Sequence, residues 1–219
     1  MGIFTKLVKL AQMCLPPKRP GSNALNSAHT MEIVLIHPEI PHNSGCAARV
    51  AAATATRLHF IKPLGFKLED RYLKRAGLDY WPMVDLVVHE SLDEAMAYFA
   101  KSSPRPLADR LRLFSARGGK SLFETKFEPD DLLLFGSESK GLPKELLAEH
   151  SDRRVYVPIQ DGVRSLNLAS VVCLSLYTAK VSAGEPLPNN QGGYEAHPER
   201  SKDLFAADIA SFPTAEEGA

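Results

Sequence analysis

Two runs of apolar residues late in the chain, Leu132–Phe135 and Val155–Ile159, have the length and composition of buried β-strands. Each run is followed by a segment rich in Gly, Ser and Asn, and each of these segments leads into a helix signal. In an open α/β sheet, ligands bind in the crevice beyond the carboxyl ends of the strands. The pattern therefore predicts that these two loops form a ligand-binding crevice.

Strand and helix patterns alternate along the rest of the central sequence. Further apolar runs predict strands at Glu32–Ile36, Leu58–Ile61, Val84–Val88 and Leu111–Ser115. The helix signals between them are Asn43 as the N-cap of an Ala-rich helix ending near Thr56, a polar helix at Glu69–Arg75, a capping box at Ser91–Glu94, and Pro143 in a first turn. This alternation predicts an α/β fold with a mostly parallel six-stranded sheet and helices on both faces.

Ser165 is predicted to cap a long final helix that has almost no polar side. Its apolar residues are Leu166, Leu168, Val171, Val172, Leu174, Leu176 and Tyr177. A helix that is apolar all round is normally buried. We therefore expect this helix either to lie inside the domain or to be covered by a second subunit.

The composition predicts one domain, at residues 31–182, between two extensions. Residues 1–30 are basic and contain no acid, which could indicate a targeting peptide, but they lack arginine density and a continuous apolar stretch. We therefore expect a flexible extension there, with Met31 as an alternative natural start. Residues 183–219 are rich in Gly, Pro, Asn and acid, so we expect a mostly disordered tail.

The overall composition restricts the class of protein. Hydrophobic residues make up 44% of the 219 residues and charged residues 24%, and no apolar run approaches the roughly 20 residues of a membrane span. Lys+Arg and Asp+Glu are balanced at 26 each, which argues against non-specific coating of nucleic acid but allows a local basic patch. The cysteines, Cys14, Cys46 and Cys173, are scattered, which fits a reducing, cytoplasmic location.

Several standard motifs do not match. Gly119-Lys120-Ser121 resembles the end of a phosphate-binding P-loop, but the required first glycine falls at Phe114. No G-x-G-x-x-G is present, and the segment around Ser137 does not match the hydrolase elbow. His37 and His42 lack Cys or acidic partners at ligand spacing, so we expect loop residues and no metal site.

Polar residues at the predicted strand ends remain as candidates for chemistry: Asn43, Arg49, Glu138, Ser165 and Asn167. Loop amides and a helix N-terminus can hold polar groups of a ligand, and the Glu138 carboxylate could meet a cationic group. The alternative readings are equally open at this point. Ser165 could be only a helix cap, and Glu138 only a solvated loop acid.

Three of these segments resemble the motifs of SPOUT-class RNA 2'-O-methyltransferases. NSGCAAR, at Asn43–Arg49, is similar to the first motif, N-x-G-x-x-x-R, and GSESKGLP, at Gly136–Pro143, to the second, usually G-P-E-x-x-G. VPIQDGVRSLNLAS, at Val157–Ser170, resembles the third, with its R-S-x-N-L core. The resemblance extends over about Met31 to Lys180 and is strongest to the small TrmL-type tRNA (cytidine/uridine-2'-O)-methyltransferases, which modify the wobble nucleotide.

The resemblance implies a deep trefoil knot at the carboxyl end of the domain, S-adenosylmethionine as cofactor, a homodimer, and the tRNA anticodon stem-loop as partner. Carried over by position, the cofactor-binding residues are Phe114, Gly136, Val157, Ile159, Ser165 and Leu166, and the catalytic residues are Asn43, Arg49, Glu138, Ser165 and Asn167. Tyr177 aligns with a tyrosine tied to dimerisation and activity. The departures are Ser137 for the usual proline, which loosens the second loop, Lys140 for arginine, and Ala169 where serine is common.

The resemblance also suggests how RNA is held. Arg71, Lys74 and Arg75 form one basic helix face that would contact the anticodon stem, together with Arg164, although such a face can also be merely solvated. Because a guanidinium keeps its proton, we expect Arg49 to act electrostatically rather than as a base. Two alternatives remain open: a methyltransferase acting on another RNA such as rRNA, and a non-catalytic RNA-binding protein on the same fold.

Overall fold

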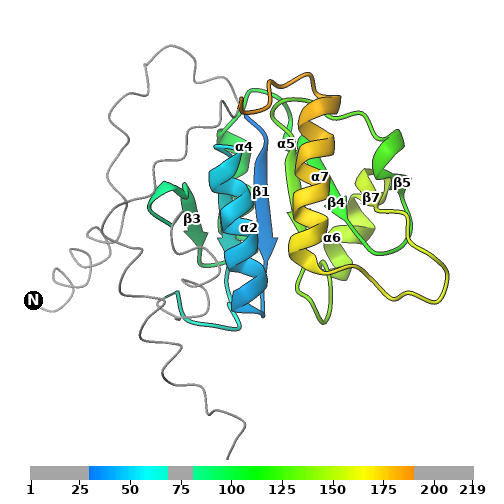
Figure 1. The fold of residues 1–219 in the computed structure, drawn as a ribbon, viewed down its shortest axis with the longest axis horizontal. Helices are drawn as coiled ribbons and strands as arrows, with labels where there is room; N and C mark the ends of the chain where they lie inside the picture. Colours follow the sequence, from blue (N-terminus) through cyan, green and yellow to red (C-terminus); the bar gives the residue numbers. More distant parts are fainter. Residues whose placement is uncertain (1–29, 69–80, 190–219) are drawn as a thin grey trace, which may run out of the picture. The chain divides into compact units, whose positions relative to one another are not determined.

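The computed structural model describes residues 30–68 and 81–189, and all elements below lie in the compact unit that ends at Leu187. Within these residues, seven strands form one sheet in the order β3-β2-β1-β6-β4-β7-β5, and every pairing is parallel (Figure 1). The strands are β1 (Glu32–Ile36), β2 (Arg57–Ile61), β3 (Leu86–His89), β4 (Leu111–Phe114), β5 (Lys120–Ser121), β6 (Leu132–Phe135) and β7 (Arg154–Tyr156). The expected parallel α/β sheet is confirmed.

The predicted number of six strands is wrong, because β5 adds a short edge strand that pairs with β7. Its segment, Lys120–Ser121, is too short and too polar to produce an apolar run. The sequence also placed the end of the last strand too late. β7 ends at Tyr156, so Val157 and Ile159 belong to the loop that follows it.

Helices cover both faces of the sheet, and each face has its own hydrophobic core. The helices are α2 (Pro41–Ala53), α4 (Leu92–Lys101), α5 (Leu107–Arg110), α6 (Lys144–Glu149) and α7 (Leu168–Ser182), with 3-10 turns η1 (Trp81–Met83), η2 (Leu122–Glu124) and η3 (Ser151–Arg153). One core joins α2 and α7 to the sheet through residues such as Leu35 and Phe135. The other joins α4 and α6 to the opposite face through Val34 and Leu134. Alternate residues of each strand therefore serve opposite cores.

Helices α2 and α7 pack side by side on one face of the sheet (Figure 1). The buried positions of α2 are nearly all small, and they include Ala47, Ala48 and Ala51. Small side chains let two helices and a sheet approach closely, which explains the Ala-rich composition of this segment. Close packing here brings the N-terminal turns of both helices to the same edge of the sheet, where β1 and β6 end.

Both predicted N-caps at this edge are wrong. α2 begins at Pro41 with Ile40 as its N-cap, because proline is well suited to the first helical turn, and Asn43 lies inside that turn. α7 begins at Leu168, and its cap is Asn167, whose Oδ1 accepts hydrogen bonds from the amides of Ala169 and Ser170. Ser165 precedes the helix. The Ser91 N-cap of α4 is confirmed, with Oγ accepting from the Glu94 amide at 3.1 Å, while the Glu94 carboxylate accepts from the Glu90 amide at 2.7 Å.

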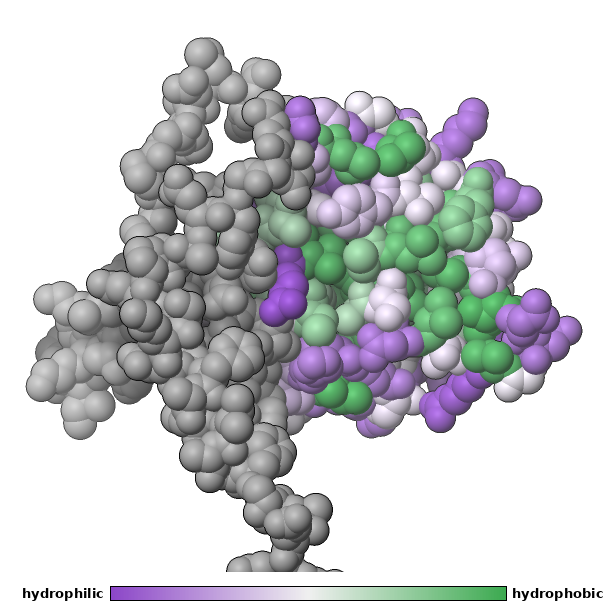
Figure 2. Space-filling view, in the orientation of Figure 1, coloured by the Kyte–Doolittle hydropathy of each residue, from purple (hydrophilic) through white to green (hydrophobic). Residues whose placement is uncertain are grey.

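α7 is not buried on all sides of this chain. Leu174 and Tyr177 are each 38% exposed and Val181 is 63% exposed, so one side of the helix faces outward. Figure 2 shows a largely hydrophobic surface in the region of this helix. None of the helices within residues 30–68 and 81–189 has the length and hydropathy needed to cross a membrane.

A cluster of buried charges fixes the amino ends of β4 and β6, opposite the edge where the predicted loops lie. The Asp131 carboxylate is fully buried and accepts from Arg105 Nη2 at 2.7 Å, from Arg112 Nε at 2.9 Å and from the Glu128 amide at 3.0 Å. Burial raises the pKa of the Asp131 carboxyl and lowers the pKa of the Arg112 guanidinium. Desolvation thus offsets much of the attraction, but each charge depends on the other being present.

We expect Asp131→Asn to lower the free energy of unfolding by about 3 kcal/mol, because it leaves the buried Arg112 guanidinium without its counter-charge, whereas Arg105 keeps its pair with Asp130. Urea unfolding at neutral pH measures this change. Asp93→Asn, on the exposed first turn of α4, is the matched control and should cost less than about 1 kcal/mol. Equal effects of the two substitutions would show that the cluster does not stabilise the sheet.

Candidate active site

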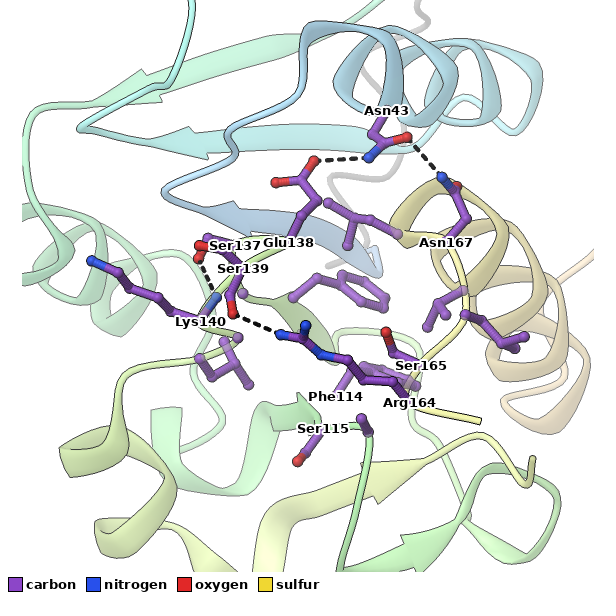
Figure 3. A pocket seen from close by; sticks show the side chains of 18 of the residues that line it. Asn43, Phe114, Ser115, Ser137, Glu138, Ser139, Lys140, Arg164, Ser165 and Asn167 are labelled. Atoms are coloured by element: carbon purple, nitrogen blue, oxygen red, sulfur yellow. Dashed lines mark hydrogen bonds between the residues drawn. The ribbon is translucent and has the colours of Figure 1, made fainter. Parts of the chain in front are cut away.

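A cavity of about 520 Å³ lies beyond the carboxyl ends of β4, β6 and β7. Its walls come from the loops that follow these three strands and from the first turns of α2 and α7 (Figure 3). The β6 loop contributes residues 136–142, and the β7 loop contributes Val157, Ile159 and residues 164–167. The predicted crevice is therefore present, and both of the loops identified in the sequence line it.

The floor of the cavity is aromatic. The rings of Phe114 and Phe135, at the ends of β4 and β6, stack with centroids 4.6 Å apart at an interplanar angle of 17°. Val157, Ile159 and Leu166 add apolar surface from the β7 loop. An apolar floor with polar groups at its rim is typical of a site for a small organic ligand.

The β6 loop is held in a tight turn. Ser137 and Gly141 exchange backbone hydrogen bonds at 3.2 and 2.8 Å, and Ser137 Oγ accepts from the Lys140 amide at 3.3 Å. A Cβ at Gly136 would overlap the backbone of Gly141 and Leu142, whereas Gly141 has open space but a φ of +73°. Ser137 was expected to loosen this loop. Its hydroxyl instead closes the turn, and the residue is buried.

Glu138, on this loop, reaches back to the start of α2. Its carboxylate accepts hydrogen bonds from the Glu39 amide at 2.8 Å, from the Ile40 amide at 3.3 Å and from Asn43 Nδ2 at 2.9 Å. It is therefore a partly buried, fully engaged carboxylate rather than a solvated loop acid. One end of α2 is tied to the carboxyl end of β6 through this side chain.

Asn43 extends the connection to α7. Its Oδ1 accepts from Asn167 Nδ2 at 2.9 Å, while Asn167 Oδ1 caps α7 (Figure 3). The cap requires an oxygen toward the α7 amides, so the nitrogen of Asn167 must face Asn43, and the nitrogen of Asn43 must then face Glu138. The hydrogen bonds that link Glu138, Asn43 and Asn167 thus fix the orientation of both side-chain amides. They join the three motif segments at one side of the cavity.

Arg164 closes the opposite side. Its side chain extends from the β7 loop toward the β6 loop, and Nη2 donates to the Ser139 carbonyl oxygen at 3.3 Å (Figure 3). Ser139 in turn donates from Oγ to Glu39 Oε1 at 2.7 Å and from its amide to Glu39 Oε2 at 3.1 Å. The hydroxyl bond lowers the pKa of the Glu39 carboxyl. These bonds are therefore formed above the ordinary carboxyl pKa and are lost only as pH falls through the lowered value.

The structure brings together most of the residues singled out in the sequence. The cavity is lined by Asn43, Phe114, Gly136, Glu138, Val157, Ile159, Arg164, Ser165, Leu166 and Asn167. Arg49, exposed on α2, and Tyr177, exposed on α7, are not among the lining residues. Arg71, Lys74 and Arg75 lie outside the described residues. The roles of all these residues remain predictions.

Sequence reasoning missed Ile40, Ser115 and Ala116 as lining residues and Glu39 as the partner of Ser139. Ser115 and Ala116 follow β4, so the rule that identified the other two loops could have found them. Glu39 gave no such signal, since its contact depends on two loops far apart in the sequence. Within the described part of the chain, no group of three or more His, Cys, Asp and Glu side chains is placed to hold a metal ion.

Fold and site together define a parallel α/β protein whose ligand cavity is built from three loops at one edge of its sheet. The model of the SpoU rRNA Methylase family matches residues 30–177. The chain therefore belongs to this family.

Relatives named as tRNA methyltransferases align with this chain over almost their whole length. The chain is 43% identical over 150 residues to a putative tRNA (cytidine(34)-2'-O)-methyltransferase of Synechocystis sp., covering 68% of this chain and 94% of the relative. It is 40% identical over 153 residues to the tRNA (cytidine(34)-2'-O)-methyltransferase of Burkholderia ambifaria, covering 69% and 95%.

Solved structures share the fold. One, described as giving structural insights into the 2-OH methylation of C/U34 on tRNA, is 46% identical with a TM-score of 0.65 and covers 71% of this chain and 97% of that one. The methyltransferase AviRb of Streptomyces viridochromogenes in complex with AdoMet has a TM-score of 0.62, covering 74% and 62%, at 22% identity. At 22% identity, the similarity to AviRb shows a shared fold and nothing further.

We expect Gly136→Ala to lower the free energy of unfolding by about 3 kcal/mol, because the added methyl overlaps backbone that cannot move without opening the β6 turn. Gly141→Ala is the matched control in the same loop, where only the positive φ is unfavourable, and it should cost about 1 kcal/mol. Thermal and urea unfolding report both values. A larger loss for Gly141→Ala would contradict the described loop geometry.

Proposed function

We propose that the chain is an S-adenosylmethionine-dependent methyltransferase that modifies the 2'-oxygen of the wobble nucleotide, cytidine or modified uridine, in tRNA anticodon loops in the cytoplasm. Residues 31–182 are its catalytic domain. The observation that carries the proposal is the Glu138–Asn43–Asn167 chain, which joins the three motif segments around one cavity. Relatives about 40% identical whose names give this activity, one of them as putative, support the choice of tRNA.

The residues present fit S-adenosylmethionine. The cavity volume suits a ligand of this size, the Phe114 and Phe135 rings and apolar β7 loop suit its purine, and the exposed backbone of the β6 loop suits its hydrogen-bonding groups. Phe114, Gly136, Val157, Ile159, Ser165 and Leu166 would hold it. When bound, the cofactor supplies a methyl group on a positively charged sulfur. The Glu138 carboxylate gives the rim of the cavity the sign of charge that favours such a cation.

Catalysis requires the acceptor oxygen to be aligned and its negative charge to be stabilised. Asn43 and Asn167 are held rigidly by their mutual hydrogen bond and by Glu138, so they keep the rim of the cavity in one geometry. Arg49 lies on the same helix as Asn43 but outside the cavity lining. Its guanidinium keeps its proton, so it clamps a phosphate of the RNA and stabilises charge on the ribose oxygen.

Two further features belong to this proposal. The β6 and β7 loops, which contact each other through Arg164 and Ser139, form the deep trefoil knot that the resemblance to SPOUT-class methyltransferases implies. The exposed apolar side of α7, with Leu174, Tyr177 and Val181, is the homodimer contact. Arg164 at the rim contacts the anticodon stem-loop, as do Arg71, Lys74 and Arg75.

Methyl transfer to total tRNA from a strain lacking its own enzyme tests the function. We expect label from S-adenosylmethionine in tRNA, at the 2'-oxygen of the wobble nucleotide, when the product is mapped. Label only in ribosomal RNA would show that the substrate is a different RNA. Tight cofactor binding without transfer to either RNA would favour a binding protein.

Arg49→Ala should reduce methyl transfer by about 100-fold to 1000-fold, because a positive charge at the acceptor oxygen is lost. Cofactor affinity, measured by calorimetry, should be unchanged, since Arg49 lies outside the cavity lining. Arg57→Ala, on β2 and paired with Asp85 at the surface, is the control arginine. Loss of cofactor affinity in Arg49→Ala would show that Arg49 supports the fold instead.

Leu174→Glu should convert the protein from a dimer to a monomer of 24.0 kDa, because it places a charge in an apolar contact between subunits. Light scattering after size exclusion measures the mass. Lys101→Glu, an exposed change on α4 at the other face of the sheet, should leave the dimer intact. A wild-type protein that is monomeric at micromolar concentration would contradict this part of the proposal.

A further inference from the structure

Two loops far apart in the sequence are joined by crossed hydrogen bonds at the rim of the cavity. Glu138, on the β6 loop, accepts the amide proton of Glu39, on the loop between β1 and α2. Glu39 in turn accepts both the amide and the hydroxyl protons of Ser139, a residue 100 positions later. Each loop therefore supplies the carboxylate that binds the other. This is the reciprocal pattern of a helix capping box, here formed between two loops.

The backbone of Glu39 is fixed independently of its side chain. Pro38 and Pro41 restrict the segment on either side, and the Pro38 carbonyl accepts the Gly65 amide at 2.9 Å. A Cβ at Gly65 would lie 2.6 Å from the Glu39 carbonyl oxygen, so this loop and the segment at Gly65 are in close contact. Replacing the Glu39 side chain should therefore leave the loop and the Glu39–Glu138 bond in place.

Ser139 uses all its polar groups to connect three loops. Its amide and hydroxyl bind Glu39, and its carbonyl accepts from Arg164 of the β7 loop. Ser139 also lines the cavity, whereas Glu39 does not. With the amide and hydroxyl held by one carboxylate, the peptide plane has little freedom to rotate, and the carbonyl stays directed toward Arg164.

We propose that Glu39 is a positioning residue for the methyltransferase site: acting through Ser139, it holds the β6 loop in the conformation that receives the cofactor. The inference rests on the proposed function, because it takes S-adenosylmethionine as the ligand of the cavity. Glu39 is not among the residues that line the cavity. Its effect should therefore fall on cofactor binding, and the chemical step at saturation should be spared.

Glu39→Gln tests the role with minimal change in shape. The Gln oxygen can still accept from the Ser139 amide, but the Gln nitrogen can only donate to Ser139 Oγ, so the hydroxyl bond is reversed and both bonds lose the negative charge that strengthens them. We expect the Kd and KM for S-adenosylmethionine to rise about tenfold, with kcat and the KM for tRNA unchanged. Ser139→Ala, which removes only the hydroxyl, should raise the cofactor KM by about threefold. Ser139→Thr, which keeps a hydroxyl that can donate to Glu39, should raise the cofactor KM less than Ser139→Ala does.

The double variant decides whether Glu39 acts through Ser139. If it does, the effects of Glu39→Gln and Ser139→Ala should add to less than their sum in the double variant, because both substitutions weaken the same contact. Fully additive losses would overturn the inference. Glu124→Gln, an exposed carboxylate outside the cavity lining, is the matched control. The thermal midpoint of every variant without ligand should match the wild type, and a purely structural role would lower it.

Measurements on the wild-type protein distinguish a failure of the proposed function from a failure of the positioning role of Glu39. If wild-type protein binds S-adenosylmethionine and methylates tRNA while Glu39→Gln behaves identically, the positioning role is wrong and the proposed function stands. If wild-type protein does not bind S-adenosylmethionine by calorimetry, the proposed function is wrong and the inference falls with it. Should Glu39→Gln fail to fold, Ser139→Ala and Ser139→Thr still decide the question, since they change one exposed side chain.

Discussion

The hydrogen bonds of Glu138 are the interaction on which the site depends. A single carboxylate binds two backbone amides and the Asn43 side chain, and Asn43 passes the connection to Asn167. Removal of this carboxylate would leave several partly buried donors unsatisfied and would break the connection between the β6 loop and α2. Asn167, the last residue in this series of hydrogen bonds, also caps α7. The last helix and the cavity therefore share one set of contacts.

The two ends of the sheet serve different purposes. At the amino ends of β4 and β6, buried arginine–aspartate pairs such as Arg112–Asp131 fix the strands. At the carboxyl ends, the loops carry hydrogen-bonding groups that converge on a cavity with an aromatic floor. The groups that fix the strands and the groups that line the cavity thus lie at opposite ends of the strands.

Most of the fold could be predicted because it rests on local signals. Apolar runs placed β1 and β6 at their observed bounds, and the Ser91 N-cap was correct. The errors occurred where several residues could do the same task. Asn43 and Ser165 are both good caps by residue type, but Pro41 and Asn167 decided where the helices begin. β5 was missed because two polar residues give no apolar pattern, and its strand character comes from pairing with β7.

The sequence by itself determined which residues could carry chemistry, since carboxylate, amide and guanidinium groups at predicted strand ends are visible in one dimension. Packing of α2 against α7 decided which of these groups meet. That packing turned Asn43 from a supposed cap into the bridge between Glu138 and Asn167, and it left Arg49 outside the cavity lining. The contact of Glu39 with Ser139 arose only in the tertiary structure. A hydrogen bond between residues 100 positions apart has no local signature in the sequence. The entropy lost in bringing the two residues together is offset only by the contacts of the whole fold.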